Sequence, residues 1–206
     1  MAPRFPILLL AALACLTVSA GWASAESAGE SVWDVGGGVG FPINGLDIAA
    51  FGGGSERPGS IGVALSPRYL YQASANLGLG AEITYMDFPG HSVSLPGGPA
   101  AASGDLLGFE AVARYLLHEQ GPTPYLVAGV GLARYAVTVS QGPTTVLDAK
   151  TTGLTLFPGV GVKTDLGERA EAMAELRWQA GSAGRAQFGT SVYNALGLFL
   201  RLGWRR

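Results

Sequence analysis

Ionisable side chains recur at alternate positions along stretches that are otherwise rich in apolar and small residues. Successive side chains of a β-strand point to opposite faces, so this pattern places the charges on one face and the apolar residues on the other. Charges enclosed by a sheet have to pair, because an unpaired ion in a low-dielectric interior is strongly destabilising. The chemistry indicated is ion pairing, and the predicted structural network consists of Asp34, Arg68, Glu82, Glu110, Arg114, Arg134, Lys163, Glu175, Arg177 and Arg201. Glu171 is a candidate fifth acid of this network.

The opposite parity of the same stretches carries bulky apolar residues and no charge. Its aromatic residues fall near the two ends of the stretches, as is typical of proteins that meet both water interfaces of a membrane. The predicted membrane-interface aromatics are Trp33, Tyr71, Tyr85, Tyr115, Tyr125, Tyr135, Trp178 and Trp204.

Eight stretches show the alternation, and the connections between them differ in length. Segments 42–60, 89–103 and 140–152 are long, whereas 74–76, 118–123 and 166–169 are short, and 181–189 is longer again. An up-and-down meander with short turns at one end and long loops at the other is typical of outer-membrane barrels. We therefore expect an all-β, eight-stranded, antiparallel transmembrane β-barrel with exterior long loops and strands at 31–41, 61–73, 77–88, 104–117, 124–139, 153–165, 170–180 and 190–204.

A soluble lipocalin-like barrel with the two faces exchanged, binding a small apolar ligand, is an alternative. The charged face also holds Leu70, Met86, Leu126 and Val130, which makes it too apolar for a water-exposed surface. The other face would have to pack about ten bulky aromatic rings into a bore only just wide enough for modest side chains. These two arguments favour the membrane orientation.

Two prolines, Pro67 and Pro158, fall inside the second and sixth expected strands. Proline cannot donate to a strand ladder, and a closed barrel has no free edge to accommodate it. The sequence leaves open whether they mark bulges or strand ends.

The first 25 residues have the features of a cleaved signal peptide: Arg4, an apolar run and the small residues Ala23, Ser24 and Ala25. A retained helix and lipidation at Cys15 are the alternatives. Residues 26–206 are then one cysteine-free domain, and no later run reaches the ~20 apolar residues of a spanning helix. The small net charge of −2 and the lack of a basic cluster give no sign of nucleic-acid binding.

The segment from Pro124 to Ala133, PYLVAGVGLA, resembles the PY-x-x-AGVG strand of OmpA-like outer-membrane β-barrel domains. The closing stretch, with Leu196, Leu198, Leu200, Leu202 and Trp204, resembles the C-terminal signal read by the barrel-assembly machinery, although Arg205 and Arg206 follow the aromatic residue. The resemblance implies a monomeric protein of the cell outer membrane that contacts membrane lipid. This family shares a fold far more than an activity.

No catalytic or metal site is expected. His91 precedes Ser92 in a long loop and His118 precedes Glu119 in a short one, and neither belongs to a set of nucleophile, base and orienting acid. Ligand clusters for a metal are lacking, no cofactor is implied, and the run from Gly36 to Gly40 continues a strand rather than a phosphate loop. A lipid-modifying barrel enzyme remains the alternative, and support for it would be His91 and a serine meeting an acid at the lipid boundary.

The expected role is structural or surface-interactive, through long exterior loops that contact an unidentified partner. An eight-stranded bore is filled by its own side chains, so an open porin is not expected.

Overall fold

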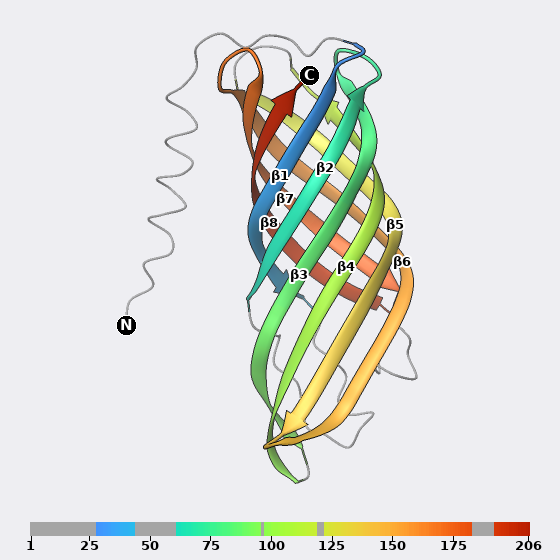
Figure 1. Cartoon of the computed structure of the whole chain (residues 1–206), viewed down its shortest axis with the longest axis vertical. Coiled ribbons are helices and arrows are strands. Elements are labelled where there is room, and N and C mark those ends of the chain that lie inside the picture. The colour runs from blue at the N-terminus through green and yellow to red at the C-terminus, as the bar shows by residue number, and fades with distance from the viewer. Residues whose placement is uncertain (1–27, 44–60, 96, 119–121, 183–191) are drawn as a thin grey trace, which may run out of the picture.

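The chain folds as a closed barrel of eight strands. The computed structural model describes residues 28–43, 61–95, 97–118, 122–182 and 192–206; the predicted signal peptide lies outside these ranges. Each strand pairs antiparallel with the next, and β8 pairs with β1 (Figure 1). The predicted fold class is therefore confirmed. The strands are β1 (Ser31–Pro42), β2 (Gly62–Gln72), β3 (Leu77–Leu95), β4 (Gly98–Leu116), β5 (Thr123–Gln141), β6 (Thr144–Asp165), β7 (Ala170–Ser182) and β8 (Val192–Arg205).

One end of the barrel carries the start of β1 and the end of β8. The Ser31 amide donates to the carbonyl of Arg206 at 3.0 Å, and the Arg206 amide donates back to Ser31 at 2.8 Å. The connections at this end, 73–76, 117–122 and 166–169, are short. We call it the short-turn end. No helix in the described ranges is long and apolar enough to cross a membrane.

Four strands continue past the opposite end of the barrel. The pairing of β2 with β3 stops at Asp87, and that of β7 with β6 begins only at Thr155. Beyond these points β3, β4, β5 and β6 still pair with one another, and they stand clear of the other four strands in Figure 1. We call residues 88–105 and 134–154 the protruding sheet.

The protruding sheet corrects the expectation of long loops at 89–103 and 140–152. Both segments are mostly strand: β3 continues to Leu95 and β4 begins at Gly98, and β5 continues to Gln141 and β6 begins at Thr144. Pairing is stabilised there by an apolar cluster on the inner face, in which Ala102, Val137 and Val139 are almost fully buried. The other two connections at this end, 44–60 and 183–191, lie outside the described residues.

The two prolines neither end their strands nor shift the register. Pro67 lies opposite Val35 in β1, and Pro158 lies opposite Ala128 in β5. On the opposite side of each strand, where β2 meets β3 and β6 meets β7, the proline and the residue before it form no ladder pair. Pairing then continues in the same register. Since proline lacks an N–H, one side of each strand forgoes a local ladder bond while the barrel stays closed.

Glycines on the inner face make room for aromatic rings that lie across the bore. A Cβ built on Gly129 would sit 2.2 Å from Cε1 of Phe157, and one on Gly161 would sit 2.3 Å from Cζ of Tyr125. Both rings are almost fully buried. The glycines therefore serve the packing of the bore as well as the curvature of the sheet.

Replacing Gly129 by alanine should lower the free energy of unfolding by about 1–3 kcal/mol, the usual cost of overpacking a close-packed interior. Gly37→Ala is the matched control, because a Cβ at that strand glycine meets nothing within 4 Å. Urea unfolding in detergent micelles, followed by tryptophan fluorescence, measures the difference. Equal stabilities of the two variants would contradict this account of the bore.

Candidate functional site

The barrel interior holds nine of the ten predicted network charges. Each of the nine is at most 3% exposed, as is Glu171. They come from every strand except β5, so the network ties distant parts of the sequence together across the bore. The buried predicted charges are Asp34, Arg68, Glu82, Glu110, Arg114, Lys163, Glu175, Arg177 and Arg201.

Asp34 bridges two arginines inside the bore. Its Oδ2 accepts from Nε of Arg68 at 2.8 Å, and its Oδ1 accepts from Nε of Arg201 at 2.6 Å. Arg68 also donates from Nη1 to Glu175 at 3.0 Å. Charge-assisted bonds of this kind are stronger than neutral ones, so Asp34 fixes β1 to β2 and β8.

Arg177 is the most heavily engaged cation of the interior. Its Nη1 donates to Oε1 of Glu82 at 2.6 Å, and its Nε donates to Oε1 of Glu175 at 3.0 Å. The rings of Phe157 and Phe199 each lie 4.3 Å from its guanidinium carbon. Two carboxylates and two aromatic faces thus replace the water that a buried guanidinium would otherwise need.

Glu110 lies directly opposite Glu82 in the pairing of β3 with β4. The hydroxyl of Thr84 donates to it at 3.3 Å and the amide nitrogen of Gln179 donates at 2.9 Å. Among the described residues no cation forms an ion pair with Glu110. This acid is therefore held by neutral donors beside a second acid.

A second group of charges occupies the short-turn end of the bore. Arg114 donates to Glu171 at 3.0 Å, and Nζ of Lys163 lies 3.3 Å from Asp165 and 3.4 Å from Glu171. Arg205 donates to Asp165 as well. The first arginine beyond the terminal aromatic residue is thus built into the interior network.

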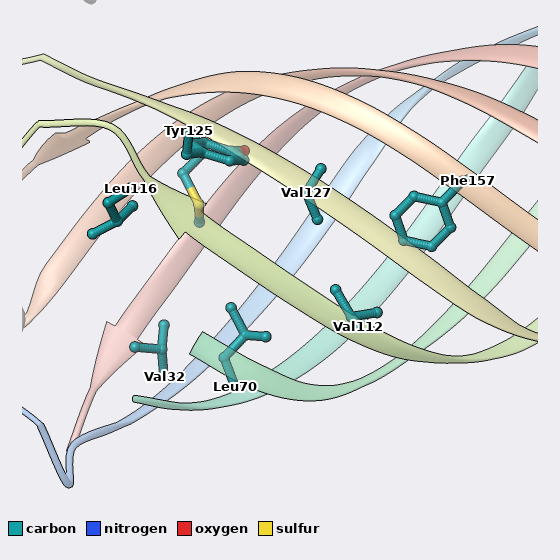
Figure 2. Close-up of a cluster of buried hydrophobic side chains, with 8 residues drawn as sticks. Val32, Leu70, Val112, Leu116, Tyr125, Val127 and Phe157 are labelled. Atoms are coloured by element: carbon teal, nitrogen blue, oxygen red, sulfur yellow. The ribbon is translucent and has the colours of Figure 1, made fainter. Parts of the chain in front are cut away.

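A cluster of buried apolar side chains also lies inside the bore (Figure 2). The cluster comprises Val32, Leu70, Val112, Leu116, Tyr125, Val127, Phe157 and Met173, all at most 3% exposed. The phenol of Tyr125 donates to Glu175 at 3.0 Å, which joins this cluster to the ion pairs. The bore of the described barrel is therefore packed with its own side chains.

The prediction that Arg134 lies inside is wrong. It is exposed on the outer face and pairs with Asp105 at 3.2 Å, with side-chain exposures of 51% and 31%. Arg134 belongs to the protruding sheet, where the outer face needs no apolar surface, so a charge there does not mark the inside. Using it to set the parity of β5 inverted both faces of that strand.

The same inversion misplaces two aromatic residues and two aliphatic ones. Tyr125 is 1% exposed inside the bore, and Tyr135 packs inward with its ring centroid 4.4 Å from that of Tyr193. Leu126 and Val130, expected inside, are 47% and 59% exposed. The other six predicted interface aromatics do face outward: Trp33, Tyr71, Tyr85, Tyr115, Trp178 and Trp204.

Several interior partners were not predicted from the sequence. Each lies an even number of residues from a buried charge in the same strand, so it points to the same face. Their residue types alone do not indicate an interior position. They are Ser66, Thr84, Phe157, Thr155, Gln179 and Phe199.

The structure describes the backbone of both histidines and the side chain of His118. The backbone of His91 lies in β3 opposite Ala102, contrary to the expected loop, and its side chain lies outside the description. His118 is exposed beside a short turn. Within the described ranges no three histidine, cysteine or acidic side chains are grouped to hold a metal ion.

Comparison with known proteins identifies the fold. No family model and no curated sequence matches the chain. Among solved structures it is similar to Ail, the attachment invasion locus protein of Yersinia pestis, at 15% identity and a TM-score of 0.55, covering 86% of this chain and 99% of that one. The outer-membrane protein OprG of Pseudomonas aeruginosa matches at 13% identity and a TM-score of 0.52, covering 88% and 98%. Neisserial surface protein A matches at 16% identity and a TM-score of 0.50, covering 90% and 98%.

The fold is that of a small outer-membrane β-barrel. At these identities the likeness concerns architecture and leaves the activity open. The bore of this chain is packed and charge-paired, and one end of the barrel carries the protruding sheet.

Replacing Arg177 by methionine should lower the free energy of unfolding by about 3–5 kcal/mol, because Glu82 and Glu175 would each lose a buried partner. Arg134→Met is the matched control. It breaks an exposed pair and should cost less than about 1 kcal/mol. Equilibrium unfolding in micelles measures the free energy of unfolding of both variants. A larger decrease for Arg134→Met than for Arg177→Met would indicate that Arg134 lies inside the bore.

Proposed function

We propose that the chain is an integral protein of the cell outer membrane, of the OmpA-like family, with a structural or surface-interaction role. The observation that carries this proposal is the outward face of the barrel. Soluble monomers rarely expose large continuous apolar surfaces, whereas a lipid-facing barrel requires one. Outward residues that are at least 41% exposed include Val35, Leu79, Ile83, Phe109, Val130, Leu156, Val160, Leu176, Leu200 and Leu202.

The short-turn end faces the periplasm and the protruding sheet faces the exterior. Outer-membrane barrels have short periplasmic turns and longer exterior connections, and the two ends of this barrel differ in the same way. The outward leucines of β8 support recognition of this strand by the assembly machinery. Within one membrane the protein is a monomer, since no edge of the barrel itself is left unpaired.

The bore serves stability and not the passage of solutes. Its charges are paired across strands, and its remaining space is taken by the apolar cluster around Tyr125 and Phe157. Opening a path would require these buried pairs to separate together. The protein is proposed to have no porin activity and no enzymatic activity.

The contact surface is the protruding sheet. Its outer face carries charges of both signs just beyond the apolar belt, including the exposed pairs of Asp105 with Arg134 and of Asp148 with Lys150. Charged patches on a rigid sheet favour recognition of a partner of complementary charge. In segments 89–103 and 140–152, paired strands thus stand where long loops were expected.

Expressed with its leader in a double-membraned bacterium, the protein should appear in the outer-membrane fraction and migrate differently on a gel with and without boiling. Purified protein in planar bilayers should give no steady conductance. A soluble periplasmic protein without the heat shift would support the lipocalin-like alternative, and a persistent open channel would contradict the plugged bore.

Single cysteines should report which end is outside. In a Cys15→Ala background, Thr145→Cys at the hairpin tip should react with a membrane-impermeant maleimide on intact cells, whereas Ser74→Cys in a short turn should react only after the outer membrane is permeabilised. Both positions are exposed. The reverse labelling pattern would invert the proposed orientation.

A further inference from the structure

A cavity opens at the short-turn end of the barrel, where the C-terminus lies in Figure 1. Its volume of about 370 Å³ is within the range of small-molecule sites. The described side chains that line it are all charged: Glu30, Glu168, Arg169, Arg205 and Arg206. A ligand in this cavity would therefore meet three guanidinium groups and two carboxylates. We call it the mouth cavity.

The ends of three neighbouring strands position these residues. The amide of Arg205 donates to the carbonyl of Arg169 at 2.8 Å, which sets the end of β8 beside the turn that precedes β7. The amide of Arg206 donates to the carbonyl of Ser31 at 2.8 Å, next to Glu30 at the start of β1. The backbone bonds that close the barrel therefore also hold the walls of the mouth cavity.

Arg205 is the buried member of the set. It is only 7% exposed, its guanidinium donates to Asp165, and its Nε lies 3.9 Å from a carboxylate oxygen of Glu171. Arg169 and Arg206, in contrast, are exposed. The mouth cavity thus combines two accessible guanidinium groups with a third that the interior network holds in place.

The two signs of charge in the lining favour a ligand that carries both. Guanidinium groups bind phosphate oxygens through paired, charge-assisted hydrogen bonds. The carboxylates of Glu30 and Glu168 accept hydrogen bonds and repel a second anion, so they favour an ammonium donor. Phosphoethanolamine offers a phosphate next to a primary ammonium. A phosphate alone lacks the cation, and a trimethylammonium group has no N–H to donate.

Two outward tryptophans lie close to the mouth cavity. Trp33 and Trp204 are opposite each other in the pairing of β1 with β8, and they are 58% and 52% exposed. Tryptophan is enriched at the level of lipid headgroups. Arg206 follows Trp204 by two residues, about 7 Å along the strand, and continues its outward parity. The cavity is therefore within reach of the headgroups that surround the two tryptophans.

We infer that the mouth cavity binds the phosphoethanolamine headgroup of a phospholipid in the periplasmic leaflet of the outer membrane. Arg169 and Arg206 bind the phosphate, and Glu30 and Glu168 bind the ammonium. The acyl chains follow the apolar outward face below the two tryptophans. One lipid then connects the turn before β7 to the ends of β8 and β1, where the barrel closes. The inference rests on the proposed function, because it needs the short-turn end at the periplasmic side of a membrane.

Quenching of tryptophan fluorescence by phospholipids with brominated tails tests the inference. In a Trp22→Phe, Trp178→Phe background, Trp33 and Trp204 are the only tryptophans, and both report on the short-turn end. The protein is reconstituted in phosphatidylcholine vesicles that contain a brominated lipid with an ethanolamine, choline or glycerol headgroup. Half-maximal quenching should need about tenfold less of the ethanolamine lipid than of either other lipid.

Two double variants in that background separate the phosphate from the ammonium contacts. Arg169→Gln with Arg206→Gln should abolish the preference for the ethanolamine lipid. Glu30→Gln with Glu168→Gln should transfer the preference to the anionic glycerol lipid, because the guanidinium groups would face no acid in the lining. Arg134→Gln is the matched control: it makes the same change in an exposed arginine at the other end and should keep the full preference. An unchanged preference in both double variants would overturn the inference.

A measurement on the wild-type protein covers variants that assemble poorly. Native mass spectrometry of protein extracted from outer membranes in detergent should show one retained phosphatidylethanolamine per barrel, which soluble glycerophosphoethanolamine should not replace. Binding of the soluble headgroup without retention of the lipid would overturn the assignment to a lipid. Heat-shifted wild-type protein that shows no preference among the three lipids would overturn the inference and leave the proposed function standing; absence from the outer membrane would remove both.

Discussion

The need to pair every charge enclosed by the barrel constrains the rest of the structure. Arg177 illustrates it: two carboxylates from β3 and β7 and two rings from β6 and β8 surround one guanidinium. Glu82, Phe157 and Phe199 lie on other strands than Arg177, so they meet it only when the sheet closes in one register. A slip of one residue would turn the acids and arginines outward and the tryptophans inward. The network therefore forms only when the barrel is closed, the strands are in this register, and the charged face of the sheet points into the bore.

Much of this could be predicted from the sequence, because alternation in a strand is a direct consequence of backbone geometry. Asp34, Arg68 and Glu82 have apolar neighbours on both sides, and their strands cross the apolar belt from end to end. The parity assigned there was correct. In β5 the charged residue is Arg134, which lies beyond the belt on the outer face, so it indicates the wrong face for Tyr125.

The protruding sheet could not be predicted in the same way. Segments 89–103 and 140–152 are rich in glycine, proline, alanine, serine and threonine, so they show no clear alternation of apolar and polar residues. Pairing there depends on the neighbouring strand and on contacts such as Ala102 with Val137 and Val139. Long-range pairing of this kind leaves little local signal.

The central claim is the assignment of faces: lipid outside, paired charges and packed side chains inside. Nuclear magnetic resonance in lipid nanodiscs containing tail-labelled paramagnetic lipid tests it most directly. The account predicts strong broadening of the methyl signals of Leu126, Val130 and Leu202, and sharp signals for Leu70 and Val127. Broadening of Leu70 and Val127 with Leu126 and Leu202 spared would contradict it, because lipid would then contact the face that carries the charges.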